Sequence, residues 1–281
     1  MRNEIWVFVE FINGEISTAS LEALSAAQHL ASLIDSRVVT ISIGFGIEKY
    51  SDLLSSYRIN AIILLDNSYL YNYILENYLN NIEKLIELRG CPDYFLFSQS
   101  TISLEIAATL SLILETNIIT GVKNISVDNN EIIYSRSICL GKYTLDEILL
   151  KKPHIISIYP HSFPKAQKVS NQEIPFVSFI NEDIVNRPNN EAELIIEDYY
   201  ELPKNSVIFD SNIVGSGGKG IMNPLSNSDL GNNETSEKYA LSLISRLSKI
   251  LRGTVGASRA IVDAGFISYD HQVGLSGKIV K

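Results

Sequence analysis

Two glycine-rich stretches in the last third of the 281-residue sequence contain the residue types that bind anionic or flat ligands. Residues 253–265 read GTVGASRAIVDAG, in which Ser258 and Arg259 come shortly after two closely spaced glycines. Arginine binds phosphate through two parallel hydrogen bonds, and its planar guanidinium also stacks on aromatic rings. A glycine, a hydroxyl and an arginine at a turn between a strand and a helix therefore suggest a binding site. The alternative is a turn with surface charges.

A second glycine-flanked hydroxyl follows a few residues later. In residues 272–278, QVGLSGK, Ser276 lies between Gly274 and Gly277, and a lysine comes next. His271 directly precedes this stretch and has the chemistry of a proton donor. The surrounding residues ISYDH read as a turn, however, so we interpret His271 as a residue of a connecting loop.

The other glycine-rich stretch, residues 215–220, spells G-x-G-x-x-G with Gly215, Gly217 and Gly220. In a dinucleotide-binding site such glycines follow a strand and open a helix, whose amino end holds the pyrophosphate. The residues that follow contain Pro224 and are not helical in pattern. A P-loop fails as well, because Lys219 is followed by glycine and not by Ser or Thr. A nicotinamide-dependent oxidoreductase is therefore a minor alternative to a flexible glycine turn.

The composition excludes several classes of protein. A net charge of −9 argues against nucleic acid and anionic membranes as partners. We find no apolar run of the ~20 residues that a membrane-spanning helix needs, and the amino terminus does not read as a signal peptide. Cys91 and Cys139 lie far apart in the sequence, so we expect two buried, reduced thiols of a cytoplasmic protein. The four histidines are scattered, and we predict no metal site.

The first part of the chain alternates between two hydrophobic patterns. Short apolar runs predict strands at residues 5–9, 37–43, 61–65 and 94–98, and helical spacing predicts helices at about 19–34, 69–88 and 101–114. Ser17 or Thr18 would cap the first helix, and Ser100 or Thr101 the third. This alternation is typical of a mostly parallel sheet with helices on both faces.

From Ile118 to Ile158 strands follow one another without helices, and Asp128-Asn129-Asn130 is a hairpin signal. We expect an antiparallel extension of the sheet there, then a loop over 160–190 and a further strand at 192–201. A boundary near residue 202 divides the chain into an α/β, nucleotide-binding-like domain, 1–202, and a second unit, 203–281.

The second unit has one convincing helix, residues 236–251, preceded by a polar stretch, 222–235, that we expect to be an exposed, mobile loop. We expect this helix to bury one apolar stripe against the rest of the unit; its members are Ala240, Leu243, Ile244, Leu247, Ile250 and Leu251. A unit of this size with one such helix is marginal for an independent core, and the sequence reads as an incomplete domain.

The glycine-rich motifs also carry a family resemblance. Residues 255–280, VGASRAIVDAGFISYDHQVGLSGKIV, together with VGSGGKG at 214–220, resemble the flavin domain of the electron transfer flavoprotein α subunit. The resemblance is dense over 253–281 and looser over the rest of the chain, where YSRSICLGKY, residues 134–143, also resembles a family segment. It implies an N-terminal α/β domain followed by a partial C-terminal FAD-binding domain.

The resemblance also assigns roles to individual residues. Arg259 matches the arginine that lies against the flavin ring, where a cation stabilises the reduced, anionic flavin. Ser258 matches a hydroxyl on the FAD side of the turn, and Ser276 stands where the family usually has a threonine near the reactive flavin nitrogen. Lys219 replaces an arginine, which keeps the charge but loses the two-pronged donor. The accompanying backbone and amide positions are Gln272, Val273, Gly274 and Gly277.

The function implied by the resemblance is that of an electron carrier. Such a subunit pairs with a β-type subunit, shares one FAD with it and passes electrons from flavin dehydrogenases toward a quinone reductase. Family members continue past the stretch that matches residues 278–280, with further residues that hold FAD, so the resemblance implies an FAD site that is incomplete within residues 1–281. A non-redox α/β binding or assembly subunit that has lost FAD is the alternative.

Overall fold

The chain folds into two compact units, residues 1–197 and 198–281. The computed structural model describes residues 3–169, 175–180, 196–198, 208, 211, 213–222 and 236–274. In this part of the chain we find no helix long and apolar enough to cross a membrane. The same residues contain no cluster of three or more His, Cys, Asp or Glu side chains that could hold a metal ion.

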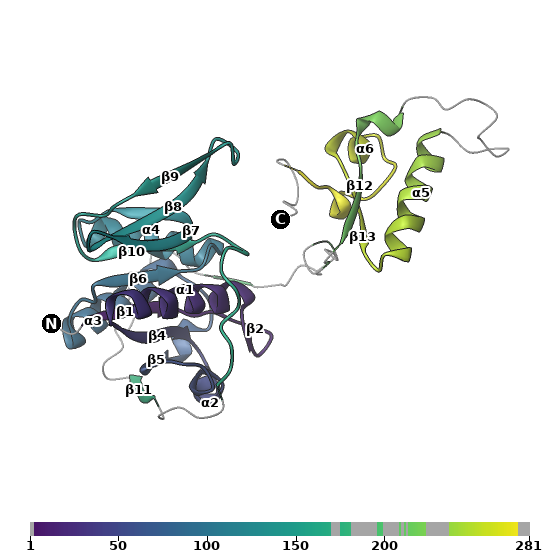
Figure 1. Ribbon diagram of the computed structural model, residues 1–281. Helices are drawn as coiled ribbons and strands as arrows, with labels where there is room; N and C mark the ends of the chain where they lie inside the picture. Colours follow the sequence, from purple (N-terminus) through teal and green to yellow (C-terminus); the bar gives the residue numbers. More distant parts are fainter. Residues whose placement is uncertain are drawn as a thin grey trace. The chain divides into compact units, whose positions relative to one another are not determined.

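A nine-stranded sheet in the order β11-β5-β4-β1-β6-β10-β7-β8-β9 is the frame of the first unit (Figure 1). Every pair from β11 to β7 is parallel, whereas β7, β8 and β9 form an antiparallel extension. The strands are β1 (Glu4–Phe8), β4 (Arg37–Gly44), β5 (Ala61–Asp66), β6 (Tyr94–Phe97), β7 (Ile118–Asp128), β8 (Glu131–Ile138), β9 (Tyr143–Glu147), β10 (His154–Ile158) and β11 (Phe176–Ile180), with a small separate hairpin of β2 (Phe11–Ile12) and β3 (Glu15–Ile16). The predicted α/β class and the antiparallel extension are confirmed.

Helices cover both faces of this sheet, and each face has its own hydrophobic core. One core contains side chains of α1 (Thr18–Ile34) and α2 (Ser51–Ser55), and the other contains side chains of α3 (Leu75–Arg89) and α4 (Thr101–Ile113). Ser17 caps α1 by accepting a hydrogen bond from the Ser20 backbone N–H, and Ser100 caps α4 in the same way through Ser103. Figure 1 shows α1 lying along the strands.

Three details of the predicted elements were wrong. The run at 69–88 is not one helix: a 3-10 turn, Ser68–Leu70, is separated from α3, which begins at Leu75. Strand β10 belongs to the parallel sheet, between β6 and β7, and not to the antiparallel extension. The expected loop over 160–190 contains β11, which pairs with β5. Each error concerns pairing with a distant strand or a local break that hydrophobic periodicity does not report.

The two cysteines are free, as expected, but both are exposed, so the prediction of buried thiols was wrong. Cys91 lies in the turn that leads from α3 into β6. Cys139 lies at the tip of the β8–β9 hairpin, in the left-handed region of backbone space with φ 51°. Cysteine is buried often as a residue type, and that preference does not apply to residues in turns at the surface.

The second unit is a parallel pair of strands, β12 (Val214–Gly217) and β13 (Thr254–Ala257), joined by the helix α5 (Ser236–Ile250). A 3-10 turn, Lys219–Met222, follows β12, and the short helix α6 (Arg259–Asp263) follows β13. Another 3-10 turn, Tyr269–His271, comes later. The predicted strand at 192–201, apart from 196–198, and the predicted loop at 222–235, apart from Met222, lie outside the described residues.

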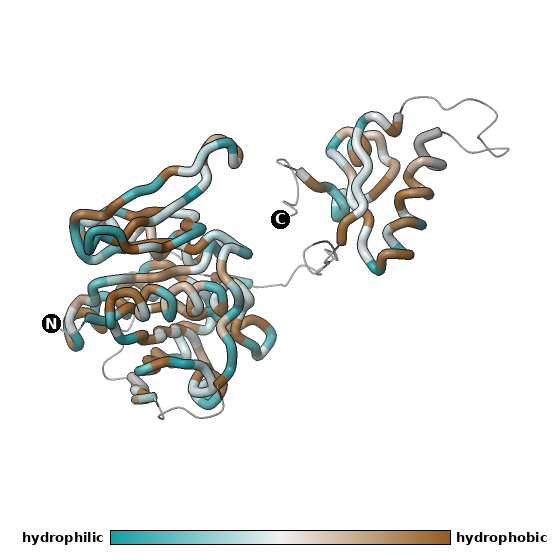
Figure 2. The backbone as a smooth tube through the Cα atoms, viewed as in Figure 1, coloured by the Kyte–Doolittle hydropathy of each residue, from teal (hydrophilic) through white to brown (hydrophobic). Residues whose placement is uncertain are grey.

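Helix α5 is present as predicted, but it does not bury the expected stripe. Ile244 is partly buried, whereas the residues Leu243, Leu247 and Ile250 are exposed by 43%, 55% and 77%. Figure 2 shows the hydrophobic residues along this helix in brown. Helix α5 instead turns Ser248, which is 1% exposed, toward β12. The described two-stranded sheet covers a narrower sector of the helix than the sequence pattern offers.

A buried histidine connects the antiparallel extension to the parallel sheet. His154, 6% exposed, begins β10, and its Nδ1 lies 2.8 Å from the hydroxyl of Tyr134 on β8. The rings of Tyr94 and Tyr134 meet the imidazole edge-on, at centroid distances of 5.1 and 5.8 Å. Burial, with the Lys152 charge nearby, lowers the pKa of His154 to about 4. The imidazole is therefore neutral in the folded unit at neutral pH.

This burial predicts a pH dependence of stability. Between pH 4 and pH 6.5 the unfolded chain binds a proton at His154 that the folded unit does not, so stability falls as the pH falls through this interval. The slope from this group reaches about 1.4 kcal/mol per pH unit. The free energy of unfolding, measured with urea at several pH values in this range, should change less steeply with pH for His154→Asn than for the unchanged chain. Equal slopes would contradict the assignment.

Candidate functional site

The candidate site lies where β12 and β13 end side by side. Gly217 and Ala257, the last residues of the two strands, are register partners. The backbone N–H of Ser258 donates to the Gly217 carbonyl at 2.9 Å and extends this pairing by one residue. Since ligands of parallel sheets bind beyond the carboxyl ends of the strands, this edge is where a site is expected. Both glycine-rich stretches of the sequence thus meet at one place.

Ser258 is the residue whose hydrogen bonding points to a ligand. It precedes α6 with an extended backbone, φ −69° and ψ 159°, yet its side chain does not cap that helix. Its Oγ is buried and has no hydrogen-bond partner within the described part of the chain. A buried hydroxyl without a partner costs on the order of 1–3 kcal/mol of stability, so such atoms call for an explanation. A bound group that accepts or donates a hydrogen bond here would remove that cost.

The glycines of residues 215–220 divide into two kinds. A methyl group at Gly215 would overlap Ser248 Oγ of α5, and at Gly217 it would lie 3.0 Å from Ile244 Cδ1. These two glycines let the helix approach the strand closely, and their role is packing. Added methyl groups at Gly218 and Gly220 would meet nothing within 4 Å. The backbone there is open to a ligand.

Two cations lie beside this edge. The first residue of α6, Arg259, is 67% exposed at its side chain, and its Nε lies 3.2 Å from Asp263 Oδ2, one turn along the helix. Lys219 is exposed at the start of the 3-10 turn after β12. The sequence did not single out Asp263, although its spacing of four residues from Arg259 is the usual one for a helical ion pair. Both cations are available to an anionic ligand.

Residues 272–274 run beside β13. Gln272 forms a bridge with Ala257 and is 2% exposed, and the Val273 N–H donates to the Ala257 carbonyl at 2.9 Å. The Val273 side chain packs over Gly256. Gly274 has φ +105°, a conformation that favours glycine. This segment holds β13 in place and leads to the stretch with Ser276 and Gly277, which lie outside the described residues.

His271 has a structural contact. Its Nδ1 lies 2.7 Å from the Val255 carbonyl oxygen, so the ring N–H donates a hydrogen bond to the backbone of β13. It lies in a 3-10 turn, as the expected connecting loop implied. Of the predicted site residues, Lys219, Ser258, Arg259 and 272–274 therefore follow the ends of the two strands or flank β13.

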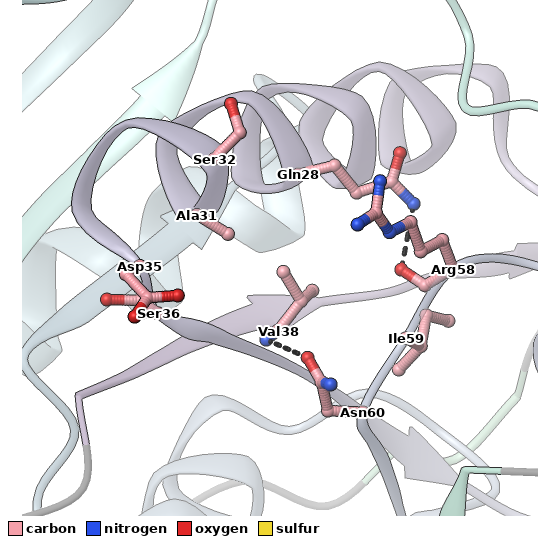
Figure 3. Close-up of a pocket in the computed structure, with 9 residues that line it drawn as sticks. All are labelled: Gln28, Ala31, Ser32, Asp35, Ser36, Val38, Arg58, Ile59 and Asn60. Atoms are coloured by element: carbon pink, nitrogen blue, oxygen red, sulfur yellow. Dashed lines mark hydrogen bonds between the residues drawn. The ribbon is translucent and has the colours of Figure 1, made fainter. Parts of the chain in front are cut away.

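A cavity of about 500 Å³ in the first unit contains none of the predicted residues. Figure 3 shows that two of its polar side chains form hydrogen bonds with backbone groups: Gln28 donates to the Arg58 carbonyl, and the Val38 N–H donates to Asn60 Oδ1. The cavity lies between the end of α1 and the starts of β4 and β5. This is the amino edge of the strands, opposite the edge where doubly wound sheets bind ligands.

Comparison with protein families gives two matches. Residues 5–180 match the family described as "Electron transfer flavoprotein domain". Residues 208–281 match the family described as "Electron transfer flavoprotein FAD-binding domain". The second match contains the whole candidate site and supports FAD as the cofactor associated with this unit.

Individual relatives agree with these matches. The chain is 28% identical over 283 residues to "Electron transfer flavoprotein subunit alpha" of Thermoanaerobacterium thermosaccharolyticum, covering 99% of this chain and 79% of the relative. It is 26% identical to the protein of the same description from Megasphaera elsdenii, over 98% of this chain and 78% of the relative. It is also 23% identical to "Acryloyl-CoA reductase electron transfer subunit beta" of Anaerotignum propionicum, over 99% and 79%.

The division of the glycines predicts different responses to the same substitution. Gly215→Ala should destabilise the second unit by about 1–3 kcal/mol, because the methyl group meets Ser248 Oγ. Adding Ser248→Ala should restore stability, since the remaining neighbours lie at 3.5 Å or beyond. Hydrogen exchange of the α5 amides measures both effects.

Gly218→Ala is the matched control and should leave the exchange of the α5 amides unchanged, because its methyl group meets nothing. Ser248→Ala alone should be neutral or slightly stabilising, since it removes a buried hydroxyl without a partner. A loss for Gly218→Ala as large as that for Gly215→Ala would contradict the packing role of Gly215.

Proposed function

Because the chain belongs to the electron transfer flavoprotein family, as an α-type member, we propose that it carries electrons through an FAD held at the ends of β12 and β13. In this proposal it pairs with a β-type subunit, receives electrons from flavin dehydrogenases and delivers them toward a quinone reductase. The two free cysteines accord with a reducing compartment such as the cytoplasm.

The single observation that carries the proposal is the buried Oγ of Ser258, which has no partner in the described chain. The Ser258 backbone is hydrogen-bonded to Gly217, which directly precedes the open backbone of Gly218, in the segment that matches the FAD-binding domain. A hydroxyl of this kind fits a cofactor with many hydrogen-bonding atoms. The residues present therefore fit FAD, and they favour a carrier over an assembly subunit that has lost its flavin.

Each residue of the site has a definite task in this proposal. FAD supplies the one- and two-electron chemistry. Ser258 and the backbone at Gly218 and Gly220 provide hydrogen-bonding groups that orient it. Arg259 and Lys219 provide positive charge, which favours negative charge on a bound ring or phosphate. Lys219 acts as a point charge, because an ammonium lacks the planar donor pair of arginine.

The alternative of a nicotinamide-dependent oxidoreductase loses its support. Gly215 and Gly217, two of the three glycines on which it rests, pack against α5. The glycines are followed by a 3-10 turn, and the α-helix that follows in the described chain begins only at Ser236. A dinucleotide fingerprint needs a helix that starts directly at the glycines, with its amino end at the pyrophosphate.

Co-expression with a β-type subunit tests the proposal. We expect a complex on gel filtration that carries the visible absorbance of bound flavin. Ser258→Ala should lower the affinity for FAD about tenfold, the loss expected for one hydrogen bond, while the chain still folds. A colourless complex, or no complex, would sink the proposal.

Substitutions that remove the charges of Arg259 and of Asp263 should shift the flavin reduction potential in opposite directions. Arg259→Ala removes a positive charge and should lower the potential by on the order of 60 mV, which is about 1.4 kcal/mol for one electron. Asp263→Asn removes the negative charge paired with Arg259 and should raise it by a smaller amount. Redox titration of the purified complex measures both shifts, with Arg246→Ala as a surface-charge control. Shifts of the same sign would contradict the pairing.

A further inference from the structure

Glu10 places a carboxylate at the carboxyl end of β1, the middle strand of the parallel part of the sheet. It lies two residues beyond the end of β1, and its Oε2 is the centre of a cluster of serines. The hydroxyl oxygens of Ser100, Ser103 and Ser98 lie 2.7, 2.8 and 3.0 Å from this oxygen. Ser98 and Ser103 are buried. This cluster has no role in the proposed electron transfer.

The serines connect the carboxylate to the amino end of α4. The Ser103 backbone N–H donates to Ser100 Oγ at 3.0 Å, and the Ser100 N–H donates to Ser98 Oγ at 3.3 Å. Ser100 Oγ and Ser98 Oγ thus accept from the backbone and lie within hydrogen-bond distance of Glu10. The positive end of the helix dipole is thereby satisfied by a negative charge of the chain itself.

The backbone of Glu10 is fixed from the opposite side by α1. The Glu10 N–H donates to Ser20 Oγ at 3.0 Å, and the Ser17 N–H donates to the Glu10 carbonyl at 2.9 Å. Ser17 is also the residue that caps α1. Glu10 therefore links the amino ends of α1 and α4, and a change of its position would disturb both helix caps.

Glu10 and its serines lie at the point of the sheet where the strand order reverses. From β1 the chain continues to β4 and β5 on one side, and then returns to β6 on the other side of β1. The carboxyl ends of β1 and β6 are thus the point where the strand order reverses. In open α/β sheets the ligand crevice lies there, and helix amino ends at that edge bind phosphate groups.

We propose that the Glu10 carboxylate occupies the position of a ligand phosphate, so that the first unit uses a nucleotide-binding architecture without binding a nucleotide at this crevice. A phosphate that approached the start of α4 would meet a fixed negative charge and hydroxyls that are already engaged. The crevice is filled by the chain, and the first unit serves as a scaffold.

Chemical rescue tests this proposal in the full chain. Glu10→Ala leaves the serines and the amino end of α4 without their anion. We expect its melting temperature to fall by on the order of 5 °C. Acetate or inorganic phosphate should then raise it again, at an ionic strength kept constant with chloride. The unchanged chain should not respond to either anion.

Three controls make the outcome decisive. Glu10→Gln fills the same space without charge, so it should be destabilised and should not respond to acetate. Leu24→Ala opens an apolar cavity in the same unit and should not respond either. Acetamide, which is neutral, should not rescue Glu10→Ala.

Two results would overturn the inference. One is a melting temperature of Glu10→Ala that is insensitive to both anions. The other is a rise for the unchanged chain with inorganic phosphate or adenosine monophosphate that is abolished by Ser100→Ala. If Glu10→Ala does not fold, Glu10→Gln decides the question together with the unchanged chain. A Glu10→Gln variant as stable as the unchanged chain, or a rise for the unchanged chain with inorganic phosphate that Ser100→Ala abolishes, overturns the inference. A destabilised Glu10→Gln without such a rise supports it.

Discussion

Burial of β1 on both faces is the constraint on which the first unit depends. Ile5 and Val7 contribute to one core, and Trp6 and Phe8 contribute to the other. Polar side chains along such a strand would be cut off from water, so they occur at its ends, where they can find hydrogen-bond partners. Glu4 binds Arg89 and the Trp6 indole at the amino end, and Glu10 binds serines at the carboxyl end. The same constraint thus fixes two acids at opposite edges of the sheet.

The second unit depends on a different constraint, which is the close approach of α5 to β12. Glycines at 215 and 217 remove the side chains that would hold the helix away. With the helix seated there, β12 and β13 end together, and Gly218, Ser258 and Arg259 follow from those two ends. Packing and binding thus use adjacent residues of one glycine-rich stretch, which explains why the pattern resembles a dinucleotide fingerprint without serving as one.

Hydrophobic periodicity and local turn and cap signals predicted most individual strands and helices. They did not predict which strands pair with each other. The alternation of strands and helices, the caps at Ser17 and Ser100, and the hairpin at Asp128–Asn130 are local signals, and all are present. Strand β10 follows an antiparallel run in sequence but pairs in parallel with β6, a partner far away in the chain. Helix α5 shows the same limit, since its apolar stripe is wider than the surface that the described unit offers.

The sequence by itself determined the fold class, the family and the two glycine-rich stretches, because each is written in residue types at short spacing. Only the tertiary structure decided which glycines pack and which lie open, since that depends on the helix opposite each of them. It alone showed that the Ser258 hydroxyl is buried without a partner in the described chain, and that Asp263 pairs with Arg259. The serines around Glu10 are distant in sequence and meet it only because parallel strands bring their carboxyl ends to one edge.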